Sequence, residues 1–236
     1  MLPILRFLLK SALVLILSLS FVPQGFASHG VAVDLTYQCI DPAVGIYQFT
    51  LVFYRDCAGA TAPGSMTLTA SNNTCGAPNV QMTQTSVTEV SQLCDVNSSS
   101  CNGGSNPGVQ QYIYQGQTQL PAGCPNLTYS WSLCCRTGLV TNLASLGSTY
   151  VQTVINTSHP QWGAGQNCNG SPQFNNIPVL YTCSGQSTFY NHGAVDPNGD
   201  SLVFSVTNPL NAAPPGGNIG YNGTFSTAQP LCTNGT

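Results

Sequence analysis

Apolar and polar residues alternate along most of the chain in short runs, which are separated by clusters of Gly, Pro, Asn and Ser. A period of two is typical of strands with one buried face, and Thr, Val and Tyr dominate these runs as they do in half-buried strands. No run after residue 28 has the period of a helix. Seven runs predict strands, at 31–40, 46–57, 65–71, 79–91, 110–120, 127–138 and 149–157.

Seven short strands at this spacing predict an all-β fold, an antiparallel sandwich resembling the immunoglobulin architecture, over residues 28–157. The first two strands should form a hairpin across 41–45, and Trp131 should lie in the core. The Gly-, Pro- and Asn-rich stretch 158–172 predicts a linker. Residues 173–236 predict a second sandwich, but they are too few for a complete one of about 100 residues.

The N-terminus has the three regions of a secretory signal peptide. Arg6 and Lys10 precede an apolar run over 11–22, and the small-residue site at 25–27 follows Pro23. The run is shorter than the roughly 20 residues that a membrane-spanning helix needs. Residues 1–27 are therefore predicted to be a cleaved signal peptide, and the protein is predicted to be secreted or displayed at the cell surface.

Charge is scarce, since 5% of residues are Asp, Glu, Lys or Arg against roughly 25% in typical soluble proteins. After cleavage the basic residues are Arg55 and Arg136, and seven acids remain, so the formal net charge becomes 2 − 7 = −5. A chain without clustered cations cannot neutralise phosphates, so nucleic acid and acidic membrane surfaces are excluded as partners. The two Arg are expected to pair with Asp, such as Asp34 or Asp56.

The cysteine content predicts disulfides, because the chain is predicted to be exported and its spacings are not those of zinc ligands. The eleven candidates are Cys39, Cys57, Cys75, Cys94, Cys101, Cys124, Cys134, Cys135, Cys168, Cys183 and Cys232. Neighbouring residues of a strand point to opposite faces, so Cys134 and Cys135 should have different partners.

Specific pairings follow as expectations. Either Cys134 or Cys135 should bond to Cys39 across the sandwich, and the other to Cys124. The remaining expected pairs are Cys57 with Cys75, Cys94 with Cys101, and Cys232 with Cys183 or with a cysteine further along a longer chain.

The stretch from Asp196 to Asp200 reads Asp-Pro-Asn-Gly-Asp and has two interpretations. Asp196, Asn198 and Asp200 supply three hard oxygen ligands of the kind that calcium binds at about 2.4 Å. An EF-hand would need a Glu where Thr207 stands, so that motif fails. The other interpretation is a plain turn, with Pro at its second position and a left-handed Gly199. Both interpretations stay open.

Catalytic motifs are weak. The sequence has no G-x-S-x-G elbow, and Glu89 is its only Glu, so acyl transfer and glycoside hydrolysis have little support. Cleavage after Ser28 would make His29 the first residue. Such a chain would resemble copper polysaccharide monooxygenases, in which the terminal amine and two imidazoles bind copper. His159 or His192 would then supply the second imidazole. Cleavage after Ala27 would prevent that arrangement. We therefore predict no enzymatic activity.

Four segments resemble a known group of proteins in the same order. They are "GVAVDLTYQC", "YQFTLVFYRDC", "YSWSLCCR" and "NNIPVLYTCSGQSTFYNHGAVDPNGDSLVFS". They look like the N-terminal region of very large secreted surface proteins of Bacteroidetes. The resemblance implies tandem Ig-like, PKD-like or cadherin-like modules, often with a gliding-motility-associated or type IX sorting domain at the C-terminus. It implies that residues 173–236 form a cadherin-like or Ig-like domain, and it supplies no catalytic residues.

The resemblance and the composition together predict a non-enzymatic adhesin or envelope scaffold, which binds other surface modules or extracellular polymers and which calcium would stiffen. The alternative is a carbohydrate-binding module of a larger secreted enzyme. Tyr residues alternate along 46–54 and 110–114, and an exposed aromatic row there would favour this alternative.

Overall fold

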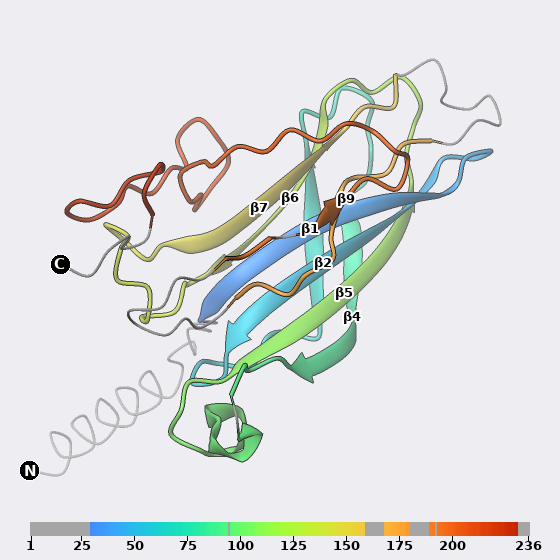
Figure 1. Cartoon of the computed structure of the whole chain (residues 1–236). Helices are drawn as coiled ribbons and strands as arrows, with labels where there is room; N and C mark the ends of the chain where they lie inside the picture. The colour runs from blue at the N-terminus through green and yellow to red at the C-terminus, as the bar shows by residue number, and fades with distance from the viewer. Residues whose placement is uncertain (1–28, 94, 159–167, 180–188, 192, 231–236) are drawn as a thin grey trace, which may run out of the picture.

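The computed structural model of the chain describes residues 29–93, 95–158, 168–179, 189–191 and 193–230 (Figure 1). The predicted signal peptide lies outside them. Seven strands match the predicted runs: β1 (Gly30–Asp41), β2 (Ile46–Asp56), β3 (Ser65–Ser71), β4 (Val80–Glu89), β5 (Val109–Gln119), β6 (Leu127–Cys134) and β7 (Ser148–Ile155). Two 3-10 turns, η1 (Val96–Ser98) and η2 (Ser100–Asn102), precede β5. No helix in the described part is long and apolar enough to cross a membrane.

The seven strands form one antiparallel sheet in the order β1-β2-β5-β4-β3-β6-β7. β3 divides its pairing, since 65–68 bond to β4 and 69–71 bond to β6. The sheet therefore bends at β3 into two layers, and β7 comes to lie near β1. The predicted all-β, sandwich-like fold is confirmed, and so is the hairpin between the first two strands.

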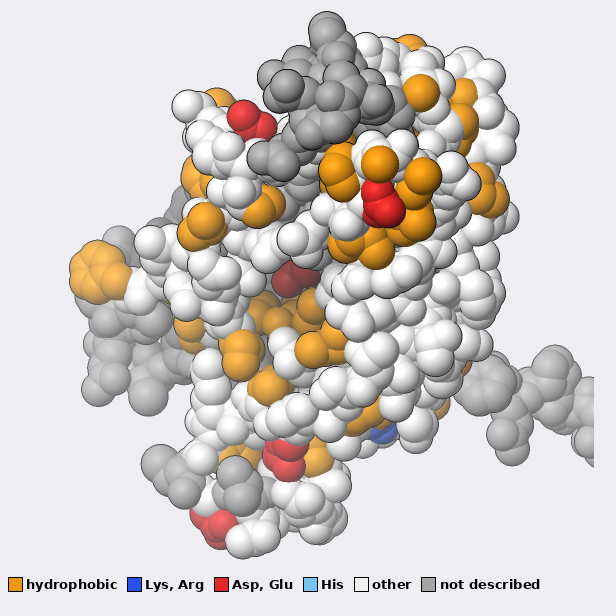
Figure 2. Space-filling model, turned by 90° about the vertical axis from the view of Figure 1, so that its right-hand side faces the viewer, with side chains coloured by type: hydrophobic (Ala, Val, Ile, Leu, Met, Phe, Trp, Pro, Cys, Tyr) orange, Lys and Arg blue, Asp and Glu red, His pale blue; other side chains and the backbone are white. Residues whose placement is uncertain are grey.

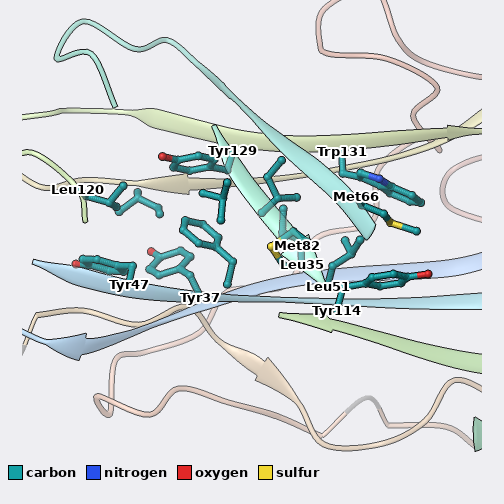
Figure 3. Close-up of a cluster of buried hydrophobic side chains, with 14 of the residues drawn as sticks. Leu35, Tyr37, Tyr47, Leu51, Met66, Met82, Tyr114, Leu120, Tyr129 and Trp131 are labelled. Carbon is teal, nitrogen blue, oxygen red and sulfur yellow. The ribbon is translucent and has the colours of Figure 1, made fainter. Parts of the chain in front are cut away.

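The core lies between the two layers, where the inward-facing residues of each strand meet (Figure 3). On β2 every second residue from Tyr47 to Phe53 is fully buried, as a period of two requires. The Phe49 ring lies 4.6 Å from the ring of Tyr129 on β6, and Phe53 meets Trp131 edge to face at 5.3 Å. Trp131 is a core residue, as predicted.

Four disulfides staple this fold: Cys39–Cys168, Cys57–Cys101, Cys75–Cys124 and Cys134–Cys135. The expected pairings were wrong for seven of these residues, including the separate partners for Cys134 and Cys135, and no partner had been expected for Cys168. The reason is strand order. The end of β2 lies opposite the start of β5, which brings Cys57 to Cys101. The end of β3 lies opposite β6, which brings Cys75 to Cys124. Cys94, Cys183 and Cys232 lie outside the described residues.

Residues 168–171 lie against the sandwich. The Ser171 amide donates to the carbonyl of Tyr37 at 2.9 Å, and the Ser171 hydroxyl accepts from the Tyr37 amide at 2.9 Å. A two-stranded ribbon follows, formed by β8 (Gln173–Phe174) and β9 (Ala194–Val195). The described part of 173–236 contains this ribbon and isolated bridges, so a second sandwich stays a prediction.

Candidate functional site

The outer face of β1, β2 and β5 is a polar surface that points away from the core. Strand register aligns its side chains into rows across the three strands. The two rows are Gln38, Gln48 and Gln117, then Thr36, Thr50 and Gln115. In the first row, Gln117 Nε2 donates to Gln48 Oε1 at 3.0 Å. This face therefore presents amides and hydroxyls, which both donate and accept hydrogen bonds without carrying charge.

The segment 173–177 lies over this face and turns it into a groove of about 350 Å³. That volume falls at the lower end of the roughly 300–1,000 Å³ typical of small-molecule sites. The lining residues are Asp34, Thr36, Gln38, Gln48, Thr50, Val52, Tyr54, Gln111, Gln115 and 173–177. Phe174 is 44% exposed and so offers an apolar ring beside the amides. We call this site the polar groove.

Three residues meet at one end of the polar groove. Tyr54 is buried, and its hydroxyl accepts from Gln111 Nε2 at 3.0 Å. Burial raises the pKa of Tyr54, and the charge of Asp34 adds to the shift. Burial also raises the pKa of Tyr190, again with a contribution from Asp34. The charge of Asp34 thus adds to the effect of burial on the pKa of both phenols, and both stay protonated and neutral.

Tyr190 also holds the wall of the groove in place. Its hydroxyl donates to the carbonyl of Ile177 at 3.2 Å, and Asn176 Nδ2 donates to the carbonyl of Asn191 at 2.7 Å. The ring of Tyr190 remains 39% exposed. Two partly exposed aromatic rings, Phe174 and Tyr190, thus accompany a row of amides and hydroxyls and one carboxylate.

The aromatic row expected along the strands is not exposed. Tyr47, Tyr112 and Tyr114 are buried at inward positions of β2 and β5, and Tyr54, on the groove face of β2, is buried as well. Among the described residues, the exposed aromatic side chains are Phe174, Phe189, Tyr190 and Phe204, all outside the predicted first sandwich. The outward Gln and Thr positions were visible in the sequence as the polar half of each strand, but the strand order that aligns them was not.

The loop from Asp196 to Asp200 has the bonding of a turn. Asp196 Oδ1 accepts from the amides of Asn198 at 2.8 Å and Asp200 at 3.2 Å. Asn198 Oδ1 accepts from the amide of Gly170 at 2.7 Å, which docks the loop near β1. Gly199 has a φ of 82°, as predicted for the turn. Calcium binding at this loop stays a prediction.

The same loop lies close to the sandwich. Burial raises the pKa of Tyr37 to about 12, and the charge of Asp196 adds to the shift. A small cavity of about 240 Å³ separates the loop from β1 and is lined in part by Pro197, Asn198 and the Cys39–Cys168 disulfide. The loop therefore connects the later segment to the body of the molecule.

The two Arg donate to backbone carbonyls and to one side-chain amide, and not to Asp56, one of the two Asp expected as their partners. Arg55 Nε donates to Ala60 O at 2.6 Å, and Nη1 donates to Gln110 Oε1 at 2.7 Å. Arg136 donates to Leu146 O at 2.9 Å and to Leu210 O at 2.6 Å. Asp56 instead accepts from the Thr137 hydroxyl at 2.8 Å and the Ala58 amide at 2.9 Å.

Among the residues considered for catalysis, those that the structure describes have hydrogen-bonding or packing roles in the fold. Glu89 accepts from the Ser91 hydroxyl and from Asn102 Nδ2, both at 2.8 Å, and its hydrogen bonds, from Ser99 foremost, lower its pKa. The ring of His29 packs on Gly59, and its Nδ1 is buried without a hydrogen-bond partner. His159 and His192 lie outside the described residues. No cluster of three His, Cys, Asp or Glu occurs within the described ranges.

Comparisons with known proteins return nothing: no protein family, curated protein or solved structure matches this chain. The function is therefore argued from the polar groove itself.

Proposed function

We propose that this chain is a non-enzymatic, secreted module of a cell-surface adhesin or envelope scaffold, and that it adheres through the polar groove to a neutral carbohydrate polymer. The observation that supports this most is the combination of uncharged amides and hydroxyls with the exposed ring of Phe174 in one groove, whose wall is bonded to the partly exposed Tyr190. This joins the two roles expected from the sequence, adhesion and carbohydrate binding.

The chemistry matches a sugar because a neutral sugar has two kinds of surface. Its hydroxyls both donate and accept hydrogen bonds, as the amides of Gln and the hydroxyls of Thr in the groove also do. Its C–H faces are apolar and pack on aromatic rings. A phosphorylated or strongly acidic ligand would need cations, and the cations of Arg55 and Arg136 are bonded to carbonyl and amide oxygens of the fold.

The surroundings fit a polymer more than a small metabolite. The groove lies on an open sheet face and not in a closed cavity. Charged side chains are few and separated on the molecular face that Figure 2 shows, which would let an uncharged chain pass over it without salt-dependent attraction. Disulfides within the sandwich would keep the face rigid outside the cell.

Binding of the secreted protein to insoluble and soluble neutral polysaccharides tests this proposal. We expect Phe174→Ala and Tyr190→Ala each to weaken binding about tenfold, since an aromatic contact contributes about 0.5–1.5 kcal/mol beyond its buried area. Leu139→Ala is the matched control, because Leu139 is also exposed but lies outside the groove.

The dependence of binding on salt concentration provides a second test of the proposed site. Binding to a neutral glycan through this groove should change little with ionic strength. Affinity that falls steeply with added salt, or that survives both aromatic substitutions, would refute the proposed site. Retained binding in Leu139→Ala alongside loss in the groove variants would support it.

A further inference from the structure

The segment 201–207 has a strand-like sequence but forms no strand with the rest of the described chain. Its sequence, Ser-Leu-Val-Phe-Ser-Val-Thr, has the composition of a strand. Within the described residues, the backbone amides and carbonyls of 201–206 make no hydrogen bond. Figure 1 shows the segment in orange, running past β7 as plain coil. Seven residues of strand-forming sequence thus leave their backbone groups open to pairing.

The side chains of this segment are also exposed. Val203 is 95% exposed, and Phe204 and Val206 are each 69% exposed. Natural proteins protect an open strand with Lys, Glu or Pro so that it does not pair with another chain. No charged residue or Pro occurs within 201–207. The segment is therefore apolar, unpaired and unprotected.

Both ends of the segment are held in place. At its start, the Asp200 amide donates to Asp196 Oδ1 at 3.2 Å. At its end, the side chain of Asn208 accepts from the Thr227 hydroxyl, and Arg136 holds the carbonyl of Leu210 at 2.6 Å. A strand anchored at both ends loses less conformational entropy on pairing than a free peptide would.

We propose that segment 201–207 pairs with the same segment of a second copy of this chain, as an antiparallel two-stranded ribbon about a twofold axis at Phe204. Antiparallel pairing of identical strands is self-complementary, because the contact of one residue with another is repeated in reverse. This inference does not depend on the polar groove or its ligand.

The register about Phe204 is the one that suits the sequence. It places Phe204 opposite Phe204, Leu202 opposite Val206 and Val203 opposite Ser205. The apolar side chains at 202, 204 and 206 then share one face of the ribbon. The only charge near the segment, Asp200, comes opposite Asn208 of the other copy, so like charges do not meet.

The strength of the contact should be modest. A two-stranded ribbon alone is marginally stable in water, so we expect a weak dimer in dilute solution. Many copies held at a surface would raise the local concentration and favour pairing. An extended segment thus would link neighbouring molecules while the polar groove stays open.

Cysteine crosslinking of the secreted full chain tests the twofold axis directly. Phe204→Cys should form a disulfide-linked dimer under mild oxidation, because opposite Cα atoms in such a pair lie about 4.5–5.5 Å apart. Val203→Cys alone should not, since its neighbour across the axis is Ser205. A mixture of Val203→Cys and Ser205→Cys molecules should crosslink again. Peptide mapping assigns each bond and separates it from the native disulfides.

Sedimentation provides the second measurement. The unmodified chain should show a mass that rises with concentration, and Phe204→Lys should weaken the dimer at least about tenfold, because two cations would meet at the axis. Leu139→Lys is the control at an exposed apolar position elsewhere. A chain that stays monomeric at every concentration, or that crosslinks equally at 203 and 204, would overturn the proposal.

Discussion

The sandwich and the segment that follows residue 168 have similar sequence patterns but different structures. In both, apolar and polar residues alternate in short runs. In β2, the inward residues are buried because β1 and β5 lie on either side and β6 covers the face. In 201–207, the same kind of run has no neighbouring strand, and its side chains are exposed.

The difference shows that alternation predicts the capacity to form a strand, and neighbours decide whether one forms. β-propensity largely measures how well a side chain packs against cross-strand neighbours. Phe49 and Phe204 illustrate this. Both lie in a strand-like run, yet Phe49 is fully buried and Phe204 is mostly exposed.

Replacing these two rings by Ala should give the largest difference in stability between the two regions. We expect Phe49→Ala to destabilise the fold by about 3–5 kcal/mol, the range for deleting a buried aromatic ring. Phe204→Ala should change the free energy of unfolding by no more than about 0.5 kcal/mol in dilute solution. Urea unfolding followed by tryptophan fluorescence measures both. Similar losses in the two variants would contradict the assignment of 201–207 as unpaired.

Removing the Cys39–Cys168 disulfide should loosen the later segment from the sandwich. It closes a loop of 129 residues, and a long-loop disulfide typically contributes about 2–4 kcal/mol. In Cys39→Ser with Cys168→Ser, we expect the Ser171 amide to lose protection from hydrogen exchange while the amides of β6 keep theirs. Cys57→Ser with Cys101→Ser is the control, because that bond lies within the sandwich. Unchanged exchange at Ser171 would show that hydrogen bonds alone hold it.

Asp196→Ala tests whether the loop is a turn or needs an ion. Because Asp196 Oδ1 accepts two amides, we expect its loss to cost about 1 kcal/mol. That cost should be equal in calcium and in excess chelator. A bound ion at 100 times its dissociation constant would instead add about 2.7 kcal/mol. Thermal melts of the unmodified protein and of Asp196→Ala, each in calcium and in excess chelator, distinguish the two cases. A melting temperature that rises only in calcium, and only in the unmodified protein, would establish that the loop binds the ion.

Tyrosine titration gives the smallest expected effect. The pKa of Tyr37 is raised to about 12, by burial first and by Asp196 second, whereas burial alone raises the pKa of Tyr129 to about 12. Because its pKa is higher in the folded than in the unfolded protein, each of these Tyr contributes to the stability of the fold fully below pH 10. That contribution is lost as the pH rises toward 12. Asp196→Asn should lower the pKa of Tyr37 and leave that of Tyr129 unchanged. Tyrosine ring resonances in an alkaline NMR titration measure each one.

The strands were predictable from the sequence because each run carries its own period and ends at turn residues. The observed bounds agree closely with the predicted runs, for example at Ser65–Ser71. The disulfides were not predictable in this way. Cys57 lies near Cys101 only because β5 returns beside β2, and that order depends on contacts between residues far apart in the sequence.

The candidate site was predictable in part for the same reason. The Gln and Thr positions of the polar groove stand out as the outward half of β1, β2 and β5. Their assembly with Phe174 and Tyr190 required the position of a segment that composition marked only as a boundary and a second domain. The resemblance to surface proteins suggested adhesion, and it contained no information about which face would adhere.

The Cys39–Cys168 bond has a consequence for a protein under tension. A pulling force that enters the chain beyond residue 168 passes through this bond directly to β1, so residues 40–167 carry no load while it is intact. At roughly 3.3–3.6 Å per residue, the chain between two cysteines 129 positions apart holds about 420–460 Å that cannot be drawn out. A cell that reduced this bond would release the part of that length that Cys57–Cys101 and Cys75–Cys124 do not still close, and the module would turn from an inextensible link into a compliant one.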